Sequence, residues 1–166
     1  MALRNIVTVG DPVLGKVCRR VLRFDEKLHT LLDDMADTLY EANGVGLAAP
    51  QVGILRRVVI VDAGEELLEL INPELIHVEG EQTGLEGCLS VPGKYGIVTR
   101  PMKATVRAQD RFGDWFEVEG EELIARCFCH ELDHLDGHIY TEKAEKMLTP
   151  EEVQALMEQE TEEEDE

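Results

Sequence analysis

Two histidines and a glutamate in one short run are the residues of this chain best suited to chemistry. His130, Glu131 and His134 form the pattern H-E-x-x-H. The surrounding stretch, residues 121–135, contains no proline or glycine and is followed by Gly137, so we predict a helix. Side chains four residues apart share one face of a helix. The two imidazoles can therefore bind one metal ion, and the carboxylate between them can reach a water on that ion.

A metal held by two histidines needs a further protein ligand, and the sequence offers several candidates. One zinc-protease pattern places a third histidine six residues after the second, but Tyr140 stands there and His138 is out of register. Glu142 and Glu145 lie too near the helix in sequence to fold back onto it easily. The ligand is therefore expected from another part of the chain.

Cys88 is the best candidate for the third ligand. It lies in a segment that resembles a turn, bounded by Gly84, Gly87 and Pro92, where a side chain can point into a site. A Cys-His-His set leaves the fourth tetrahedral position to water, which is the catalytic arrangement. The alternative is that Cys88 is a small buried apolar side chain, as single cysteines often are.

A second segment, residues 44–53, is rich in glycine and other small residues. A dinucleotide-binding loop is excluded, because a predicted helix precedes the glycines and Pro50 interrupts any helix after them. Small residues here would let the backbone approach a ligand closely, and Gln51 would offer a neutral amide donor. The alternative is a tight buried connection without a ligand.

The chain has 166 residues and a formal net charge of −19. About half of this excess lies in residues 149–166, which contain nine acidic side chains and no lysine or arginine. A chain this acidic gains nothing from counterion release on nucleic acid, so broad RNA or DNA binding is not expected. No apolar run reaches the ~18 residues of a membrane span and no signal-peptide pattern is present, so we expect a cytoplasmic protein.

The four cysteines are expected to be thiols or metal ligands rather than disulfides. They are Cys18, Cys88, Cys127 and Cys129. The last two stand two residues apart on different faces of the predicted metal-binding helix, so a bond between them is not expected.

Helices are predicted near both ends of the chain. Asp11-Pro12 indicates a short helical turn, and Asp25 caps a longer helix that ends with Gly44 in a left-handed conformation. Thr149 caps a further helix that starts at Pro150. The apolar side chains of the longer helix recur at helical spacing: Leu28, Leu31, Leu32, Met35 and Leu39.

Strands are predicted between these helices. They span residues 56–62, 68–71, 74–78, 104–110 and 115–119. Asn72-Pro73 separates the second strand from the third, and the last two flank a turn and form a hairpin. This order of elements favours an α+β fold over alternating βαβ units.

Three of these segments together resemble a known family. GVGLAAPQ at residues 44–51, EGCLS at 86–90 and HELDH at 130–134 are similar, in this order and at these separations, to the three signature motifs of peptide deformylases. The resemblance extends from about residue 4 to residue 148. Members of this family remove the N-formyl group from the initiator methionine of new polypeptides. The resemblance therefore implies a metal-dependent amide hydrolase that acts on N-formylmethionyl peptides and releases formate.

The resemblance also implies roles for individual residues. Cys88, His130 and His134 would hold the metal, and Glu131 would take a proton from the water and deliver it to the leaving amine. The Leu89 backbone N–H and the Gln51 side-chain amide would hold the oxyanion. An apolar pocket would take the methionine side chain, and backbone groups would pair with the extended peptide. The residues implied are Val45, Leu123 and Cys127 for the pocket, and Gly46 and Gly87 for the backbone contacts. Arg126 is expected at the pocket rim with its charge in water.

The metal implied by the family is Fe²⁺, one ion per chain, and a Cys-His-His set also suits Zn²⁺, Ni²⁺ or Co²⁺. The implied fold is a single α+β domain with strands packed around the metal-binding helix. We expect residues 1–148 to form the catalytic domain and residues 149–166 an acidic helix or tail.

Two departures from the family pattern are visible. Cys129 stands where the family usually has Gln, and it is expected to change the polarity beside the site but not the reaction. No basic residue follows Lys146, so ribosome association through a basic C-terminal helix is not expected.

Two other classes of protein fit the same motifs. One is a metal-dependent endopeptidase that uses the same helix. The other is a non-catalytic domain with a structural zinc, which would need a fourth protein ligand. The candidates for that ligand are Cys18, Cys129, His77 and His138.

Overall fold

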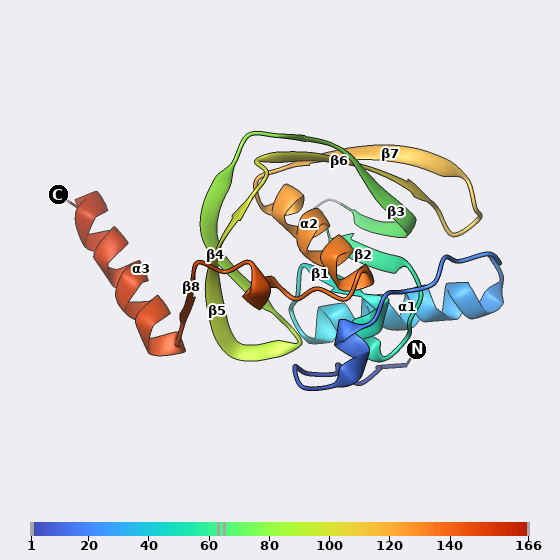
Figure 1. The fold of residues 1–166 in the computed structure, drawn as a ribbon, viewed down its shortest axis with the longest axis horizontal. Helices are drawn as coiled ribbons and strands as arrows, with labels where there is room; N and C mark the ends of the chain where they lie inside the picture. The colour runs from blue at the N-terminus through green and yellow to red at the C-terminus, as the bar shows by residue number, and fades with distance from the viewer. Residues whose placement is uncertain (1, 63, 65, 166) are drawn as a thin grey trace.

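A computed structural model describes residues 2–62, 64 and 66–165 of the chain. Two antiparallel sheets surround the central helix α2 (Leu123–Leu135), and α3 (Pro150–Asp165) extends away from them at the periphery (Figure 1). Helix α2 packs against strands of both sheets. The expected α+β fold, with strands packed around the metal-binding helix, is therefore confirmed.

Five strands form the larger sheet, in the order β1-β2-β3-β6-β7, and three form the smaller one, in the order β4-β5-β8. Neighbouring strands are antiparallel throughout. The larger sheet contains β1 (Gly46–Ala48), β2 (Val58–Asp62), β3 (Leu67–Glu79), β6 (Lys103–Gln109) and β7 (Trp115–Glu121). The smaller sheet contains β4 (Gln82–Cys88), β5 (Val91–Arg100) and β8 (Lys146–Leu148). The short 3-10 helices are η1 (Pro12–Gly15), η2 (Ala49–Val52) and η3 (Tyr140–Glu142).

Helix α1 (Glu26–Glu41) forms as predicted and buries its apolar stripe. The Asp25 side chain accepts a hydrogen bond from Leu28 N, which caps the helix. The prediction for its C-terminal end was wrong by one residue, because Asn43, with φ +56°, takes the left-handed conformation. Gly44 is required for a different reason: a Cβ there would lie 2.7 Å from Leu39 Cδ1.

Strand β2 is buried on both of its faces, which explains its continuous run of apolar residues. Val58 and Ile60 pack with the stripe of α1, whereas Val59 and Val61 pack with α2. The larger sheet thus separates two hydrophobic clusters and supports α2 from one side.

Strand β3 is one bulged strand where two were predicted. At the bulge Asn72 has φ +51°, a conformation that asparagine tolerates better than most residues. Its side-chain oxygen accepts from Val21 N at 2.8 Å and its amide donates to Val21 O at 3.0 Å. The pairing with β6 resumes at Glu74, opposite Arg107. The side-chain hydrogen bonds of Asn72 therefore stabilise the bulge in β3. From the sequence, Asn72-Pro73 predicted the end of a strand at this point.

Helix α3 begins where predicted, with Glu152 N donating to Thr149 Oγ1 at 3.3 Å. The helix packs against β5 and β8, and Val153 in its first turn is buried at 8% exposure. No helix within the described part of the chain is both long and apolar enough to cross a membrane.

Candidate metal centre

Helix α2 presents His130 and His134 on one face. Both side chains are buried, and their ring centroids lie 5.0 Å apart. The helix begins at Leu123, two residues later than predicted, because Glu121 still pairs with β6 as the last residue of β7. The spacing predicted from the motif is therefore present in the fold.

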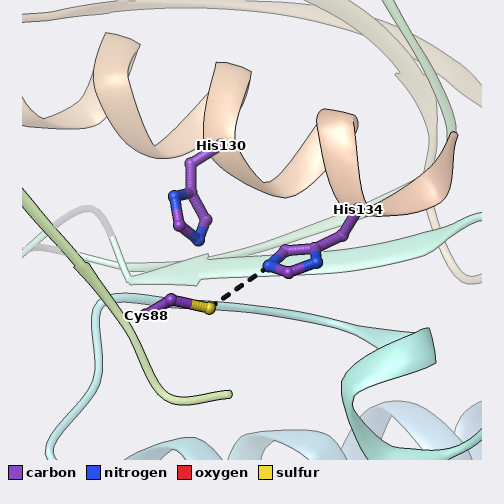
Figure 2. A group of neighbouring side chains, drawn as sticks. All are labelled: Cys88, His130 and His134. Carbon is purple, nitrogen blue, oxygen red and sulfur yellow. Dashed lines mark hydrogen bonds between the residues drawn. The ribbon is translucent and has the colours of Figure 1, made fainter. Parts of the chain in front are cut away.

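The Cys88 side chain points toward the same place. Its Sγ lies 3.4 Å from Nε2 of His134. The thiol and the two rings each offer one donor atom, and these atoms all lie within 4.8 Å of one another. Figure 2 shows the three side chains converging from α2 and from the end of β4. The structure thus brings together the three residues that sequence reasoning selected as ligands.

The local structure around Cys88 differs from the prediction. The segment that resembles a turn is mostly strand, and Cys88 is the last residue of β4, paired with Val91 across a tight turn. The strands β4 and β5 were missed because glycine and proline are depleted in strands. Close packing explains why glycine stands at positions 87 and 96. A Cβ at Gly87 would lie 3.1 Å from the Tyr95 ring, and a Cβ at Gly96 would lie 2.9 Å from Ala144 Cβ.

Glu86 orients the ring of His130. Its Oε2 lies 2.6 Å from His130 Nδ1, and Arg100 donates to both of its oxygens at 3.1 and 2.7 Å. Burial raises the pKa of Glu86, but the hydrogen bonds from His130 and Arg100 outweigh burial and lower the pKa to about 2. An ionised carboxylate only accepts hydrogen bonds, so Nδ1 of His130 carries a proton, and Nε2 holds the lone pair when the ring is neutral.

Sequence reasoning missed Glu86, although a signal for it exists. Glu86 stands two residues before Cys88, and side chains two apart on a strand point to the same face. No comparable local signal indicates Arg100, which comes from β5.

The prediction for Arg126 was wrong. Its side chain is buried, with 6% exposure, and its guanidinium does not reach water. Nη1 donates to Glu86 Oε1 at 3.0 Å and to the backbone oxygen of Val98 at 3.1 Å. A buried charge is tolerated only when it is paired and hydrogen-bonded, and Glu86 supplies that pairing.

The pKa values of the two histidines are shifted in opposite directions. Burial lowers the pKa of His130, but the hydrogen bonds to Cys88 and Glu86 overcome burial and raise it above its ordinary value. Burial, and then the charge of His130, lower the pKa of His134. Of the two histidines, His130 therefore holds an additional proton more readily than His134, and it does so beside the Cys88 thiol and the Glu86 carboxylate. A divalent cation can replace that proton, because His and Cys bind metals in deprotonated form.

Glu131 is buried beside these rings. Its Oε1 lies 3.7 Å from His130 Nε2, and its Oε2 is buried without a hydrogen-bond partner among the described residues. Burial raises the pKa of Glu131 to about 7, against the opposing charge of His130. The backbone of β1 lies close to it, since a Cβ at Gly46 would be 3.0 Å from Glu131 Cγ. A carboxyl group with this pKa can both take up and release a proton near neutral pH.

The two predicted oxyanion donors both adjoin the thiol. Gln51 Nε2 donates to Ser90 Oγ at 3.1 Å and lies 3.5 Å from Cys88 Sγ. Gln51 Oε1 accepts from Ala48 N at 3.0 Å, which fixes the orientation of the amide. Leu89 follows Cys88 in the turn.

A cavity of about 470 Å³ is lined by Cys88, His130 and Glu131. All five residues predicted to bind substrate line it: Val45, Gly46, Gly87, Leu123 and Cys127. Further lining residues that sequence reasoning did not select include Asn43, Lys94 and Tyr95. The cavity therefore joins the donor atoms to a largely apolar space.

Comparison with known proteins decides the family. The family model for polypeptide deformylase matches residues 3–149. A peptide deformylase of Agathobacter rectalis is 63% identical over 148 residues, which is 89% of this chain and 94% of that protein. A peptide deformylase of Caldicellulosiruptor bescii is 54% identical over 93% of each chain. This chain belongs to the polypeptide deformylase family.

Solved structures of deformylases have the same fold. The crystal structure of a peptide deformylase from Thermotoga maritima superposes with a TM-score of 0.85 at 37% identity, covering 88% of this chain and all of that one. One from Legionella pneumophila gives 0.83 at 40% identity, covering 96% and 98% of the two chains. The resemblance identified from three short motifs is therefore confirmed over nearly the whole chain.

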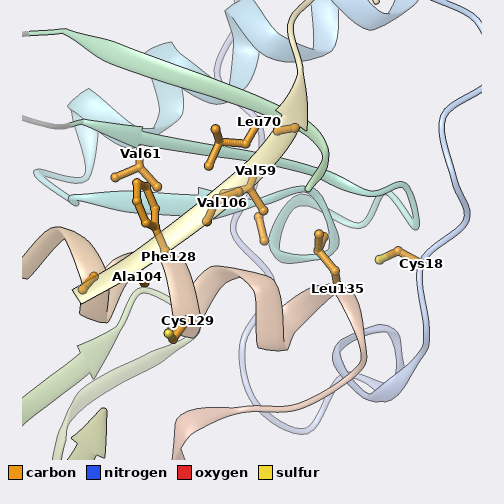
Figure 3. Close-up of a cluster of buried hydrophobic side chains, with 12 residues drawn as sticks. Cys18, Val59, Val61, Leu70, Ala104, Val106, Phe128, Cys129 and Leu135 are labelled. Carbon is orange, nitrogen blue, oxygen red and sulfur yellow. The ribbon is translucent and has the colours of Figure 1, made fainter. Parts of the chain in front are cut away.

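The alternative ligands of a closed, structural zinc site lie elsewhere in this deformylase. His77 pairs with Glu79, and His138 with Glu142. Cys18 packs in the hydrophobic cluster drawn in Figure 3. Among the described residues, Cys88, His130 and His134 form the one group of three with the geometry of a metal site. Three converging donors beside an open cavity fit a catalytic ion rather than a structural one.

Cys129, the departure from the family pattern, lies on another face of α2 and is 7% exposed (Figure 3). It packs in the same cluster as Phe128 and Leu135. All four cysteines are free, as predicted.

Proposed function

We propose that this chain hydrolyses the N-formyl amide of formylmethionyl peptides, releasing formate and a free amino terminus, during protein biosynthesis. Membership of the deformylase family supports this activity. The observation that carries it is the convergence of Cys88, His130 and His134 beside Glu131 and a cavity. An endopeptidase with the same helix motif is the less favoured alternative.

In this proposal Cys88, His130 and His134 hold one divalent cation. The donor set fits, because a thiolate and two imidazoles suit first-row transition metals. When bound, such a cation activates water and polarises a carbonyl oxygen at neutral pH. We propose Fe²⁺ as the ion, with Zn²⁺, Ni²⁺ or Co²⁺ able to replace it.

Glu131 moves the proton. Its Oε2 has no hydrogen-bond partner among the described residues, so it can accept the proton of the attacking water. The protonated carboxyl then delivers that proton to the amine nitrogen as the C–N bond breaks. The water oxygen becomes part of formic acid as the amine leaves neutral, and the acid then loses its proton to solvent and becomes formate.

Gln51 and Leu89 stabilise the oxygen that gains charge when water adds to the formyl carbon. The Gln51 amide and the Leu89 backbone N–H both adjoin Cys88, so they can donate to one oxygen there. A single donor of this kind contributes about 2.7–4 kcal/mol to transition-state stability. Gln51 would give up its hydrogen bond to Ser90 and donate to the substrate oxygen instead.

The cavity holds the rest of the substrate. Leu123 and Cys127 of α2, with Val45, offer apolar surface to the methionine side chain. Gly46 in β1 and Gly87 in β4 leave backbone groups accessible to an extended peptide, which would bind as an added strand. We propose that residues 1–148 suffice for this activity, that the protein acts in the cytoplasm, and that any ribosome association does not use a basic C-terminal helix.

The test is deformylation of formyl-Met-Ala-Ser, with casein as the competing substrate and metal content measured on the same sample. We expect rapid release of formate and no cleavage of casein. Cys88→Ser should lose both bound metal and activity, because it removes one of three donors. Cleavage of casein without formate release would support the endopeptidase instead.

The metal assignment has its own test. Fe²⁺ beside a thiolate reacts with oxygen, so protein purified in air should lose activity, and added Ni²⁺ or Co²⁺ should restore it. Equal activity with every metal, and no loss in air, would count against iron.

A further inference from the structure

Arg126 lies where two parts of the site meet. It lines the cavity together with Leu123 and Cys127, yet its guanidinium is buried. That guanidinium donates to Glu86 Oε1 at 3.0 Å, and the other oxygen of Glu86 lies 2.6 Å from His130 Nδ1. One side chain therefore adjoins the substrate cavity and, through a single carboxylate, the ring of a candidate metal ligand.

We propose that Arg126 is a positioning residue with two separable parts: its aliphatic stem forms a wall of the methionine pocket, and its guanidinium, acting through Glu86, fixes the His130 ring for metal binding. The role of the stem rests on the proposed function, because it depends on what occupies the cavity. The role of the guanidinium does not.

The hydrogen bonds of Glu86 carry the second part of this proposal. A carboxylate has roughly four acceptor positions. Here two are taken by Arg100, one by Arg126 and one by His130. The carboxylate plane is therefore held from three sides. Without Arg126, the oxygen Oε1 keeps only the longer bond to Arg100, at 3.1 Å, so the carboxylate is held less firmly although Arg100 still bonds both of its oxygens. The orientation of the His130 ring would then be less tightly fixed.

Helix geometry makes Arg126 suited to this task. Arg126 and His130 are four residues apart on α2, so they lie on one face and reach the same carboxylate. A second bond, from Nη1 to the Val98 oxygen, ties the guanidinium to β5. Lysine would keep the charge but not the fork of donors.

Three substitutions separate the two parts. R126M keeps an apolar stem and removes every donor, R126A removes both parts, and R126K keeps the stem and the charge but not the fork of donors. R111M is the matched control, since Arg111 makes a similar fork to Glu69 and Asp33 but does not line the cavity. Folding of each variant is checked by circular dichroism and thermal melting.

The first measurement is binding of Co²⁺ to the metal-free protein, followed by the visible absorption of the Co²⁺ form. In R126M we expect the dissociation constant for Co²⁺ to rise about 10–100-fold, with altered absorption bands. R126K should show a smaller rise, and R111M should match wild type. Wild-type affinity and absorption in R126M would overturn the role of the guanidinium. If R126M does not fold, a wild-type dissociation constant for Co²⁺ in R126K would instead overturn the role of the guanidinium.

The second measurement is KM for formyl-Met-Ala-Ser at saturating Co²⁺. We expect R126M to stay within about twofold of wild type and R126A to rise several-fold, because only R126A loses the wall. An equal KM in R126A and wild type would overturn the role of the stem. If wild type itself released no formate, the proposed function would fail while the Co²⁺ measurements still decided the role of the guanidinium.

Discussion

The three candidate ligands are supported unequally by their neighbours. His130 is held by the buried carboxylate of Glu86, whereas Nδ1 of His134 is buried without a hydrogen-bond partner among the described residues. Cys88 lies next to the Gln51 amide, which can donate to its sulfur. A carboxylate partner raises the basicity of an imidazole, so His130 is the stronger nitrogen donor of the pair.

Glu131→Gln tests the proposed base. The amide has nearly the same shape but cannot accept the proton of water, so turnover of formyl-Met-Ala-Ser should fall about 100- to 10,000-fold. Metal content should not change, because Glu131 is not among the proposed ligands. Glu142→Gln is the control, since Glu142 is exposed and pairs with the exposed His138. Near-normal turnover in the Glu131 variant would show that another group is the base.

Glu86 should make the stability of the metal-free protein depend on acid pH. Its pKa is lowered from 4.5 to about 2, so its contribution is fully present above pH 4.5 and disappears as the pH falls through 2. The shift corresponds to about 3 kcal/mol of unfolding free energy. Glu86→Gln does not titrate and lacks this contribution.

The measurement is urea unfolding of wild type and Glu86→Gln at a series of pH values below neutral. The difference in unfolding free energy between the two proteins should narrow steadily as the pH falls from 4.5 toward 2. A difference that stayed constant with pH would mean that Glu86 has an ordinary pKa in the folded protein.

At the scale of elements, the site depends on the close approach of β1 to α2. Gly46 leaves its Cα facing the Glu131 side chain, and a Cβ there would lie 3.0 Å from Cγ and 3.2 Å from Oε1. The strand is only three residues long and is held by its pairing with β2. A glycine at this position therefore sets the distance between a strand and the carboxylate of a helix.

Gly46→Ala should displace that carboxylate without removing it. We expect kcat to fall about 10- to 100-fold, because small misplacements of a reacting group are costly. Bound metal should remain, because the three atoms nearest the added methyl group all belong to Glu131, which is not a proposed ligand. Gly15→Ala is the control, since a Cβ there meets nothing within 4 Å. Unchanged kcat in Gly46→Ala would mean that the position of Glu131 is not critical.

At the scale of the whole molecule, the negative charge is concentrated away from the site. Residues 149–166 hold about half of the net charge of −19, and α3 extends from the smaller sheet at the edge of the molecule (Figure 1). The candidate ligands lie instead on α2 and at the end of β4, inside the two sheets. The acidic helix and the proposed reaction are therefore structurally separate.

Deletion of residues 149–166 should leave kcat/KM for formyl-Met-Ala-Ser within about twofold of the full chain. The buried contact of Val153 is lost with these residues. Burial of a valine contributes about 1.5 kcal/mol, so the melting temperature should fall by about 3–6 °C. The strand β8 is retained because it ends at Leu148. Loss of activity at a temperature where the shortened chain is folded would contradict the proposed boundary.

Several features could be predicted from the sequence because they depend on neighbours along the chain. The caps Asp25 and Thr149, the apolar stripe of α1 and the spacing of His130 and His134 are local patterns of this kind. Strand prediction failed where glycine, proline or asparagine interrupted the pattern, at Asn72 and along β4 and β5. At those positions packing and side-chain hydrogen bonds outweigh local preference.

By itself, the sequence determined the reactive residue types, the helix that carries two of them and, through three ordered motifs, the family. Only the tertiary structure decided that Arg126 is buried and that Glu86 links it to His130. The physical reason is that a charged side chain can be buried only if its partner is brought to it. Those partners come from β4 and β5, some 28 to 40 residues away along the chain.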